Sequence, residues 1–266
     1  MNAQKRSVNP QILLETLCCL TFAGVLLYLI LTEGYQRYVA PKTLPYLYFS
    51  VVVMIVWSAA GLMRINRNRH RVRVAHCLPL LLPIVLLFLP LAPISSSSFS
   101  SGYLSGGSVS GSLGGSPNGN TPVQIPGAAE PAFGAELSGL DEDNRTITVS
   151  DSEFYLWITK LYEDPSKYEG YEVTMTGFVF RDASQMEDNQ FVPARLMMTC
   201  CVSDLLPVGL LAEVPEQVSS LPETDSWVKV TGTLHYEEYE GFLEPRLNVT
   251  TTVSAEEVPG YLFPTY

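Results

Sequence analysis

The chain has 266 residues, of which 47% are hydrophobic and 16% are charged, and its formal net charge at pH 7 is −11. The charge is divided unevenly: residues 1–94 hold nine Lys or Arg and two Asp or Glu (+7), whereas residues 95–266 hold seven and twenty-five (−18). The strongly acidic segment 95–266 would repel phosphate backbones, which argues against nucleic-acid binding. Metal ions, cationic ligands and protein partners remain open.

Three apolar runs lie in the first 94 residues, at 12–31, 44–63 and 77–94. Each is close to the ~20 residues that a helix needs to cross ~30 Å of hydrocarbon. The third run contains four prolines, which remove backbone donors that lipid cannot replace, so we expect a kinked anchoring helix or one packed against a neighbour. The sequence therefore predicts a membrane region of three helices.

The positions of the cations predict how these helices are oriented. Lys5 and Arg6 precede the first run, and five arginines lie at 64–73, between the second and third runs. Short loops rich in Lys and Arg stay in the cytoplasm. We therefore expect a multi-pass membrane protein with a cytoplasmic N-terminus and an extracytoplasmic C-terminal domain.

Residues 95–135 are rich in Ser, Gly and Pro and have no hydrophobic period. A segment of this composition cannot bury enough apolar surface to offset the entropy of ordering the chain. We expect a flexible linker with an r.m.s. reach on the order of 35 Å.

Residues 140–266 are enough for one hydrophobic core and are expected to begin with a helix. Ser150 or Asp151 suits the N-cap of this helix, and Pro165 is expected to end it. The apolar residues that fall on one helical stripe are Phe154, Ile158 and Leu161.

Five segments rich in Val, Thr, Phe and Tyr follow the helix and read as strands. Gly177 and Gly232 fall in the middle of two of them, where a strand bends around a tight barrel. Five strands with short turns predict a small, mainly β, OB-like Greek-key barrel as the soluble C-terminal domain. The segments are 171–182, 191–204, 208–214, 226–239 and 242–258.

Two of these segments carry a family resemblance: SDSEFYLWITKLYEDPSKYEGYEVTMTGFVFRD (150–182) and FVPARLMMTCCVSDLLPVGLLAE (191–213). Behind an N-terminal membrane region, they resemble the YcgQ-like proteins, a bacterial family of permease subunits with no established activity. The resemblance covers nearly the whole chain. It implies a protein of the bacterial cell envelope that works beside an integral-membrane permease, whose own family looks like exporters of metalloid or other small species.

Members of that family often carry a His-rich stretch between the second and third membrane helices. Here the corresponding segment has only His70 and His76 among arginines. This departure argues against metal capture by the cytoplasmic loop.

The adjacent thiols of Cys200 and Cys201 are the chief candidates for ligand binding, because thiolates hold soft metals and metalloids well. In a regular strand, however, adjacent side chains point to opposite faces, so both sulfurs can reach one ion only if the backbone bulges. The competing interpretation places one cysteine in the core and its neighbour partly exposed. A disulfide, within the pair or to a partner, is a further alternative outside the cytoplasm.

Arg195, Asp204 and His235 are expected to lie near the thiols if the barrel brings them together, although no spacing here matches a Cys-x-x-Cys zinc site. The ligand-binding candidates are thus Cys200, Cys201, Asp204 and Arg195, and the candidate cofactor is a soft metal ion. His235 also lies in the Tyr- and Glu-rich segment 235–246, which is typical of a solvated hairpin.

Asp151 and Glu153 resemble paired catalytic carboxylates, but the start of a helix favours acidic residues in any case. No Ser-His-Asp set, P-loop or HExxH motif occurs in the sequence. We therefore expect a non-enzymatic accessory subunit of a membrane permease, whose external domain binds substrate or partner at the outer mouth. The alternative is an envelope structural or interaction protein that binds glycan or protein.

Overall fold

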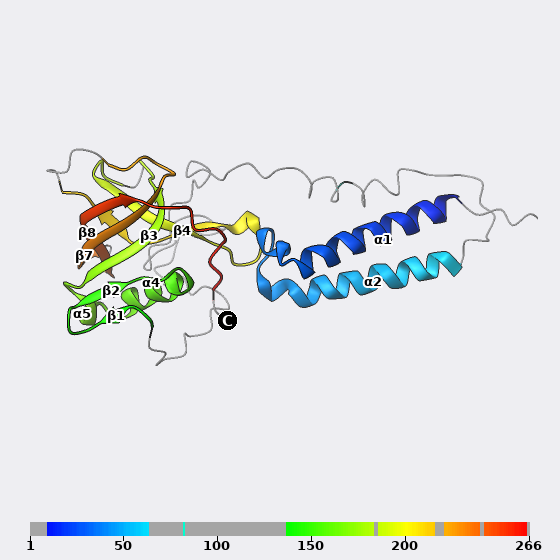
Figure 1. Cartoon of the computed structure of the whole chain (residues 1–266), viewed down its shortest axis with the longest axis horizontal. Coiled ribbons are helices and arrows are strands. Elements are labelled where there is room, and N and C mark those ends of the chain that lie inside the picture. The colour runs from blue at the N-terminus through cyan, green and yellow to red at the C-terminus, as the bar shows by residue number, and fades with distance from the viewer. Residues whose placement is uncertain are drawn as a thin grey trace, which may run out of the picture. The chain divides into compact units, whose positions relative to one another are not determined.

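The structure is a computed structural model, and it describes residues 10–63, 82, 137–183, 186–215, 221–239 and 242–264. The chain divides into two compact units, Met1–Pro93 and Ile94–Tyr266. Figure 1 draws the described residues of the first unit in blue to cyan and those of the second in green to red.

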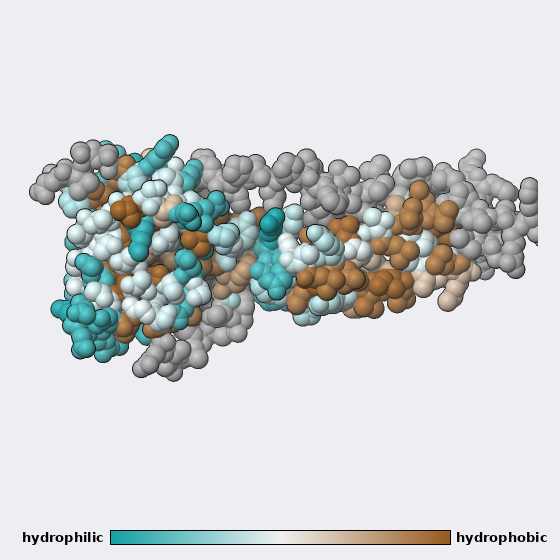
Figure 2. Space-filling view, viewed as in Figure 1, coloured by the Kyte–Doolittle hydropathy of each residue, from teal (hydrophilic) through white to brown (hydrophobic). Residues whose placement is uncertain are grey.

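Within its described residues, 10–63 and 82, the first unit contains two long apolar helices, α1 (Pro10–Leu31) and α2 (Leu44–Met63). Two short 3-10 helices, Gly34–Arg37 and Pro41–Thr43, connect them. Both long helices are long and apolar enough to cross a membrane. Their outer surfaces are dominated by hydrophobic side chains, which Figure 2 colours brown.

These two helices confirm the helices expected at 12–31 and 44–63. Ala23 and Ile30 of α1 pack against Val51 of α2, so the two helices share a small apolar interface. The third expected helix, at 77–94, and the arginine-rich loop at 64–73 lie outside the described residues, apart from the single residue Leu82. The expected linker at 95–135 also lies outside them.

The second unit is mainly β. Its described strands are β1 (Leu140–Asp141), β2 (Thr146–Thr148), β3 (Glu172–Phe180), β4 (Gln190–Met197), β5 (Leu206–Val208), β6 (Leu211–Glu213), β7 (Trp227–Tyr239) and β8 (Phe242–Ser254). Its described helical segments are η5 (Asp151–Glu153), α4 (Phe154–Glu163), α5 (Pro165–Tyr168) and η6 (Val202–Asp204).

Five of these strands close into a ring in the order β3, β7, β8, β6, β4 and back to β3. The β6–β8 pair is parallel, and the other four pairs are antiparallel. Closure of the ring leaves no free edge among these five strands. The predicted β-barrel is therefore confirmed.

The expected strand at 208–214 is interrupted at Gly209 and Leu210, so that Val208 ends β5 and the separate strand β6 begins at Leu211. β5 pairs with the C-terminal half of β4, whereas β6 pairs with the start of β4 and with β8. The prediction of a single strand here was wrong, because two partners at different positions compete for one short apolar run.

Glycine permits close approach of strands at two points of the barrel. A Cβ atom at Gly177 of β3 would lie 2.6 Å from the carbonyl carbon of Pro193 in β4. In the β7–β8 pair, the register shifts between Thr231 and Gly232. Both mid-strand glycines therefore stand where the strands crowd or bend, as the sequence predicted.

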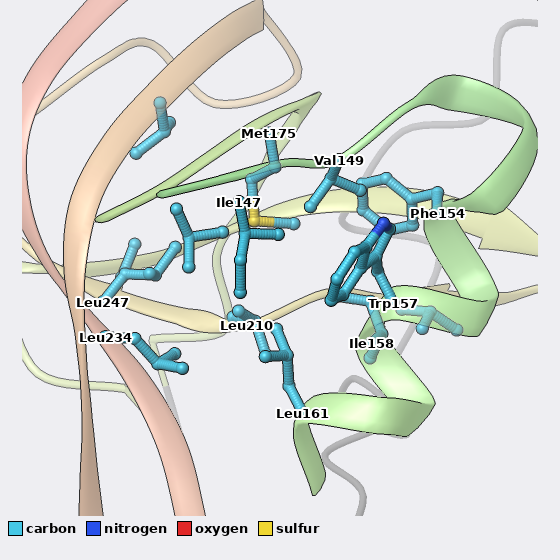
Figure 3. Packing of buried hydrophobic residues seen from close by; sticks show 14 of the residues in the cluster. Ile147, Val149, Phe154, Trp157, Ile158, Leu161, Met175, Leu210, Leu234 and Leu247 are labelled. Atoms are coloured by element: carbon cyan, nitrogen blue, oxygen red, sulfur yellow. The ribbon is translucent and has the colours of Figure 1, made fainter. Parts of the chain in front are cut away.

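The helix α4 covers one part of the barrel with its apolar stripe. Phe154, Trp157, Ile158 and Leu161 are buried and belong to one cluster with barrel residues (Figure 3). The indole Nε1 of Trp157 donates to the carbonyl oxygen of Ser138 at 3.0 Å, which satisfies its one polar atom. The barrel residues labelled beside them are Met175, Leu210, Leu234 and Leu247.

The boundaries of this helix differ from the expectation in one detail. α4 ends at Glu163, and Pro165 begins the short helix α5 instead of only terminating the preceding one. A proline at the first helical position has no N–H that the helix requires and is already set to a helical φ. Pro165 therefore separates two helices.

Candidate functional site

The strand β4 ends at Met197, and the next residues form a turn that leads into the 3-10 helix η6. Asp204 fixes this turn through its carboxylate. Its Oδ1 accepts the backbone N–H of Thr199 at 3.0 Å, and its Oδ2 accepts those of Cys200 at 2.6 Å and Cys201 at 3.3 Å. One side chain thus satisfies three consecutive backbone donors and sets the path of the chain.

The two cysteines lie in this turn with their side chains close together. Their Sγ atoms are 3.6 Å apart, and the two sulfurs and a carboxylate oxygen of Asp204 all lie within 4.8 Å of one another. Cys200 is exposed, and Cys201 and Asp204 are half-buried. We call these three residues the thiol–carboxylate loop.

This geometry overturns two expectations about the pair. Strand alternation does not apply, because β4 stops three residues before Cys200, so both sulfurs lie on one side. The interpretation of one cysteine as a core residue was also wrong, since neither Cys200 nor Cys201 is buried. From the sequence, a bulge in the strand was required for both sulfurs to reach one ion. In the structure a turn, and not a bulge, brings the two sulfurs together.

The electrostatic setting keeps the Cys200 thiol protonated in the absence of a cation. The Asp204 carboxylate, acting as hydrogen-bond acceptor, raises the pKa of the Cys200 thiol to about 12, and the Cys201 thiol adds to the shift. A thiolate placed beside a carboxylate is disfavoured because like charges repel. A bound metal ion would reverse that preference, since metal ligands must be deprotonated.

Arg195 occupies a different environment from the thiols. Its side chain is 5% exposed, and its Nη1 donates to Oδ1 of Asp151 at 3.1 Å. Its guanidinium also lies 5.8 Å from the ring of Phe154 and 5.6 Å from that of Trp227. Burial lowers the pKa of Arg195, and the charge of Asp151 opposes the shift. These contacts join the start of α4 to the barrel, and among the described contacts none leads from Arg195 to the thiol–carboxylate loop.

His235 lies in a charged network that the sequence did not reveal. Arg246 of β8 forms ion pairs with Glu213 at 3.0 Å, with Glu244 at 3.3 Å and with Glu237. The Nε2 atom of His235 lies 3.8 Å from Glu213, and only 25% of its side chain is exposed. The expectation of a solvated hairpin was therefore wrong for His235, because the parallel pairing of β6 with β8 brings Glu213 onto this face.

The carboxylates at the start of α4 are structural. Glu153 accepts hydrogen bonds from the Ser138 hydroxyl, from the Ser150 hydroxyl at 2.9 Å and from the backbone N–H of Ser138 at 3.2 Å, and these bonds lower its pKa. Ser150 stands at the N-cap of η5, but its side chain makes no capping bond to the backbone. Asp151 is engaged by Arg195, so the two carboxylates have separate structural partners.

These features define a membrane-type protein in which two apolar helices precede a β-barrel domain that carries one exposed and one half-buried thiol beside a carboxylate. The chain belongs to the DUF1980 family: its N-terminal domain matches residues 14–104, and its C-terminal domain matches residues 132–264. The C-terminal match takes in α4, the barrel and the thiol–carboxylate loop.

The chain is also similar to one curated protein, UPF0703 protein YcgQ of Bacillus subtilis (strain 168), with 26% identity over 98 residues. The matched part is 37% of this chain and 33% of that protein, so the chain aligns with about one third of the relative's length. The YcgQ-like family suggested by the two sequence segments is thereby confirmed. No solved structure matches the chain.

Proposed function

We propose that this protein is a non-enzymatic accessory subunit of a bacterial membrane permease, and that its C-terminal domain binds a thiophilic metal or metalloid ion outside the cytoplasm. The observation that carries this proposal is the thiol–carboxylate loop, in which three potential ligand atoms lie within 4.8 Å of one another. Within the described residues, no other three His, Cys, Asp or Glu side chains form such a cluster of potential ligand atoms.

The chemistry of the loop supports ion binding over catalysis. Thiolates are soft ligands that select thiophilic ions from the harder cations that carboxylates alone would take. A catalytic cysteine requires a lowered pKa, whereas the pKa of Cys200 is raised to about 12. Cys200 is therefore a poor nucleophile, and it becomes a good ligand once a cation displaces its proton.

The barrel topology supports a binding role as well. The ring order of β3, β4, β6, β8 and β7, with β6 and β8 parallel, is the reason we assign the barrel to the OB type. Barrels of this type commonly bind ligands, although the fold alone does not name the ligand. The three potential ligand atoms of the thiol–carboxylate loop are what indicate an ion as the ligand.

The permease partner is proposed from the membrane region. The two apolar helices α1 and α2 anchor the chain, and the cation-rich segments at its N-terminus and at 64–73 favour the cytoplasmic side. A domain that follows three crossings would then meet ions at the outer mouth of a transporter. The resemblance to the YcgQ-like proteins supports the same partner.

The test is the metal content of the full-length protein purified in mild detergent. After equilibration with Cd²⁺, Zn²⁺ or Ag⁺ and gel filtration, the protein should retain an ion, and the variant Cys200→Ser/Cys201→Ser should lose it. Cys18→Ser/Cys19→Ser is the matched control, because these two adjacent thiols lie in α1. Equal retention by both double variants, or no retention by the unaltered protein, would refute ion binding at the loop.

The permease partner is tested separately, by identifying the proteins that co-purify with the full-length chain. A multi-helix transporter in the purified complex supports the proposal. Recovery of cell-wall proteins or glycan alone, together with no ion, would favour the alternative of an envelope interaction protein.

A further inference from the structure

We infer that the thiol–carboxylate loop is a transfer site for one four-coordinate divalent ion of the Zn²⁺ or Cd²⁺ kind. Cys200, Cys201 and Asp204 supply three ligands, and the fourth position is left to water or to a group from a partner. This inference rests on the proposed function and specifies the ion and the mode of its exchange.

The separation of the sulfurs selects the coordination geometry. With metal–sulfur bonds of about 2.3 Å, two sulfurs lie about 3.8 Å apart on a tetrahedral ion and about 4.6 Å apart on a linear two-coordinate ion. The Sγ atoms of Cys200 and Cys201 are 3.6 Å apart. The pair is therefore close to the tetrahedral distance and would have to open by about 1 Å for a linear ion such as Ag⁺.

The carboxylate of Asp204 offers an acceptor position to an ion that displaces the Cys200 proton. Its Oδ2 accepts two backbone N–H groups, its Oδ1 accepts that of Thr199, and the Cys200 thiol also donates to this carboxylate. Loss of the thiol proton on metal binding frees the lone pair that this thiol occupied. The backbone donors also hold the carboxylate in a fixed orientation, as outer hydrogen bonds commonly do for metal ligands.

The ligand set favours a borderline divalent ion. A mixed set of two thiolates and one carboxylate suits Zn²⁺ and its relatives better than ions that prefer sulfur alone. When M²⁺ binds, the two thiol protons go to solvent and two S–M bonds form, so the formal charge of the loop does not change. A monovalent or trivalent ion that displaced the same two protons would leave the loop with a changed charge.

The exposure of the loop argues for an open fourth position. Structural zinc sites have four protein ligands, whereas sites that exchange ligands have three and an open position. Cys200 is exposed, and the described residues add no fourth His, Cys, Asp or Glu to the cluster. His235, which was expected from the sequence to lie near the thiols, lies beside Glu213 instead. An ion held in this way can be passed to a partner that supplies the fourth ligand.

Co²⁺ is the probe for the coordination geometry, because it replaces Zn²⁺ and its absorption reports coordination number and sulfur ligation. The full-length protein in detergent should take up one Co²⁺ and show the intense visible bands of a tetrahedral ion with thiolate charge-transfer bands in the near ultraviolet. Both should disappear in Cys200→Ser/Cys201→Ser and persist in Cys18→Ser/Cys19→Ser. Zn²⁺ should displace the Co²⁺ and remove the bands.

The open position is tested with added imidazole, which should shift the visible bands of the Co²⁺-loaded protein. Bands that imidazole does not shift would mean a closed site and would overturn the transfer role. Cys200→Ser leaves the backbone bonds to Asp204 intact, since these use the N–H of residue 200 and not its side chain, so this variant should fold and show weaker charge-transfer bands.

Two failures are distinguishable. If the protein retains Ag⁺ through Cys200 and Cys201 but gives no tetrahedral Co²⁺ spectrum, the inferred geometry is wrong and the proposed ion-binding function stands. If it retains no thiophilic ion at all, both are wrong.

Discussion

The Oδ2 atom of Asp204 accepts the backbone N–H of Cys200 at 2.6 Å, so the residue that shapes the turn also places its negative charge beside the exposed thiol. The same carboxylate raises the pKa of Cys200 to about 12. Loop conformation, thiol protonation and the candidate ligand set therefore depend on one side chain.

The first prediction concerns thiol reactivity. Cys200 is exposed, but with a pKa of about 12 it should react slowly with iodoacetamide at pH 8. The thiol is protonated below its pKa, so the thiolate fraction is on the order of 10³-fold lower than that of a free cysteine of pKa about 8.5. The rate should rise about tenfold per pH unit through pH 8 to 11, as measured by mass spectrometry of the modified peptide.

The control for this prediction is Asp204→Asn, which removes the negative charge and should accelerate alkylation of Cys200 at pH 8. An unaltered protein whose Cys200 reacts as fast as a free thiol would contradict the electrostatic account.

The second prediction concerns loop stability. Asp204→Ala should lower the free energy of unfolding by about 1 to 3 kcal/mol, because three backbone N–H groups lose their acceptor. Cys200→Ser should cost less than about 0.5 kcal/mol, since the side chain is exposed. Thermal unfolding of the full-length protein in detergent measures both.

A matched control for Asp204→Ala is Glu238→Ala, which removes an exposed carboxylate from β7. If the two alanine variants unfold at the same temperature, the three hydrogen bonds of Asp204 do not stabilise the turn.

The third prediction concerns the buried cation Arg195. Asp151→Ala leaves a guanidinium that is 5% exposed without its carboxylate partner, and it should destabilise the protein by about 2 to 4 kcal/mol. Arg195→Met keeps most of the volume between Phe154 and Trp227 and leaves only the exposed Asp151 unpaired, so it should cost about 1 kcal/mol or less.

Chemical denaturation of the two variants gives the comparison, with the surface change Lys229→Met as control. The opposite order, with Arg195→Met the more damaging, would mean that the ring contacts of the guanidinium outweigh the burial of its charge.

The fourth prediction concerns topology. The cation-rich segments at 5–6 and 64–73 should be cytoplasmic and residues 95–266 extracytoplasmic. A C-terminal fusion to a phosphatase that is active only outside the cytoplasm should be active. Activity of a reporter that works only in the cytoplasm, fused at the same point, would contradict this orientation.

Local patterns in the sequence predicted much of the fold. The apolar runs fixed α1 and α2, and the spacing of Phe154, Ile158 and Leu161 fixed the buried face of α4. Gly177 and Gly232 marked the crowded points of the barrel. These features depend on periodicity or on a single backbone requirement, so neighbouring residues carry the information.

The candidate site depended on a turn that the apolar pattern of residues 191–204 did not indicate. Residues 191–204 read as one strand, but the hydrogen bonds to Asp204 stop it after Met197 and turn Cys200 and Cys201 to the same side. An aspartate shortly after two adjacent cysteines is the signal that was available, because Asp commonly accepts nearby backbone N–H groups.

The charged network around Arg246 was missed for a different reason. Glu213 reaches it through the parallel pairing of β6 with β8, which joins segments separated by a long stretch of chain. The register of such a pair is set by the whole barrel, so the local sequence did not predict that Glu213 and Arg246 would be in contact.

The most direct test of the central claim is the X-ray absorption spectrum of the Zn²⁺-loaded full-length protein in mild detergent. The account predicts two sulfur neighbours at about 2.3 Å and two oxygen or nitrogen neighbours at about 2.0 to 2.2 Å, with the sulfur signal lost in Cys200→Ser/Cys201→Ser and retained in Cys18→Ser/Cys19→Ser. A first shell without sulfur, or one whose sulfur signal survives the loss of Cys200 and Cys201, would contradict it.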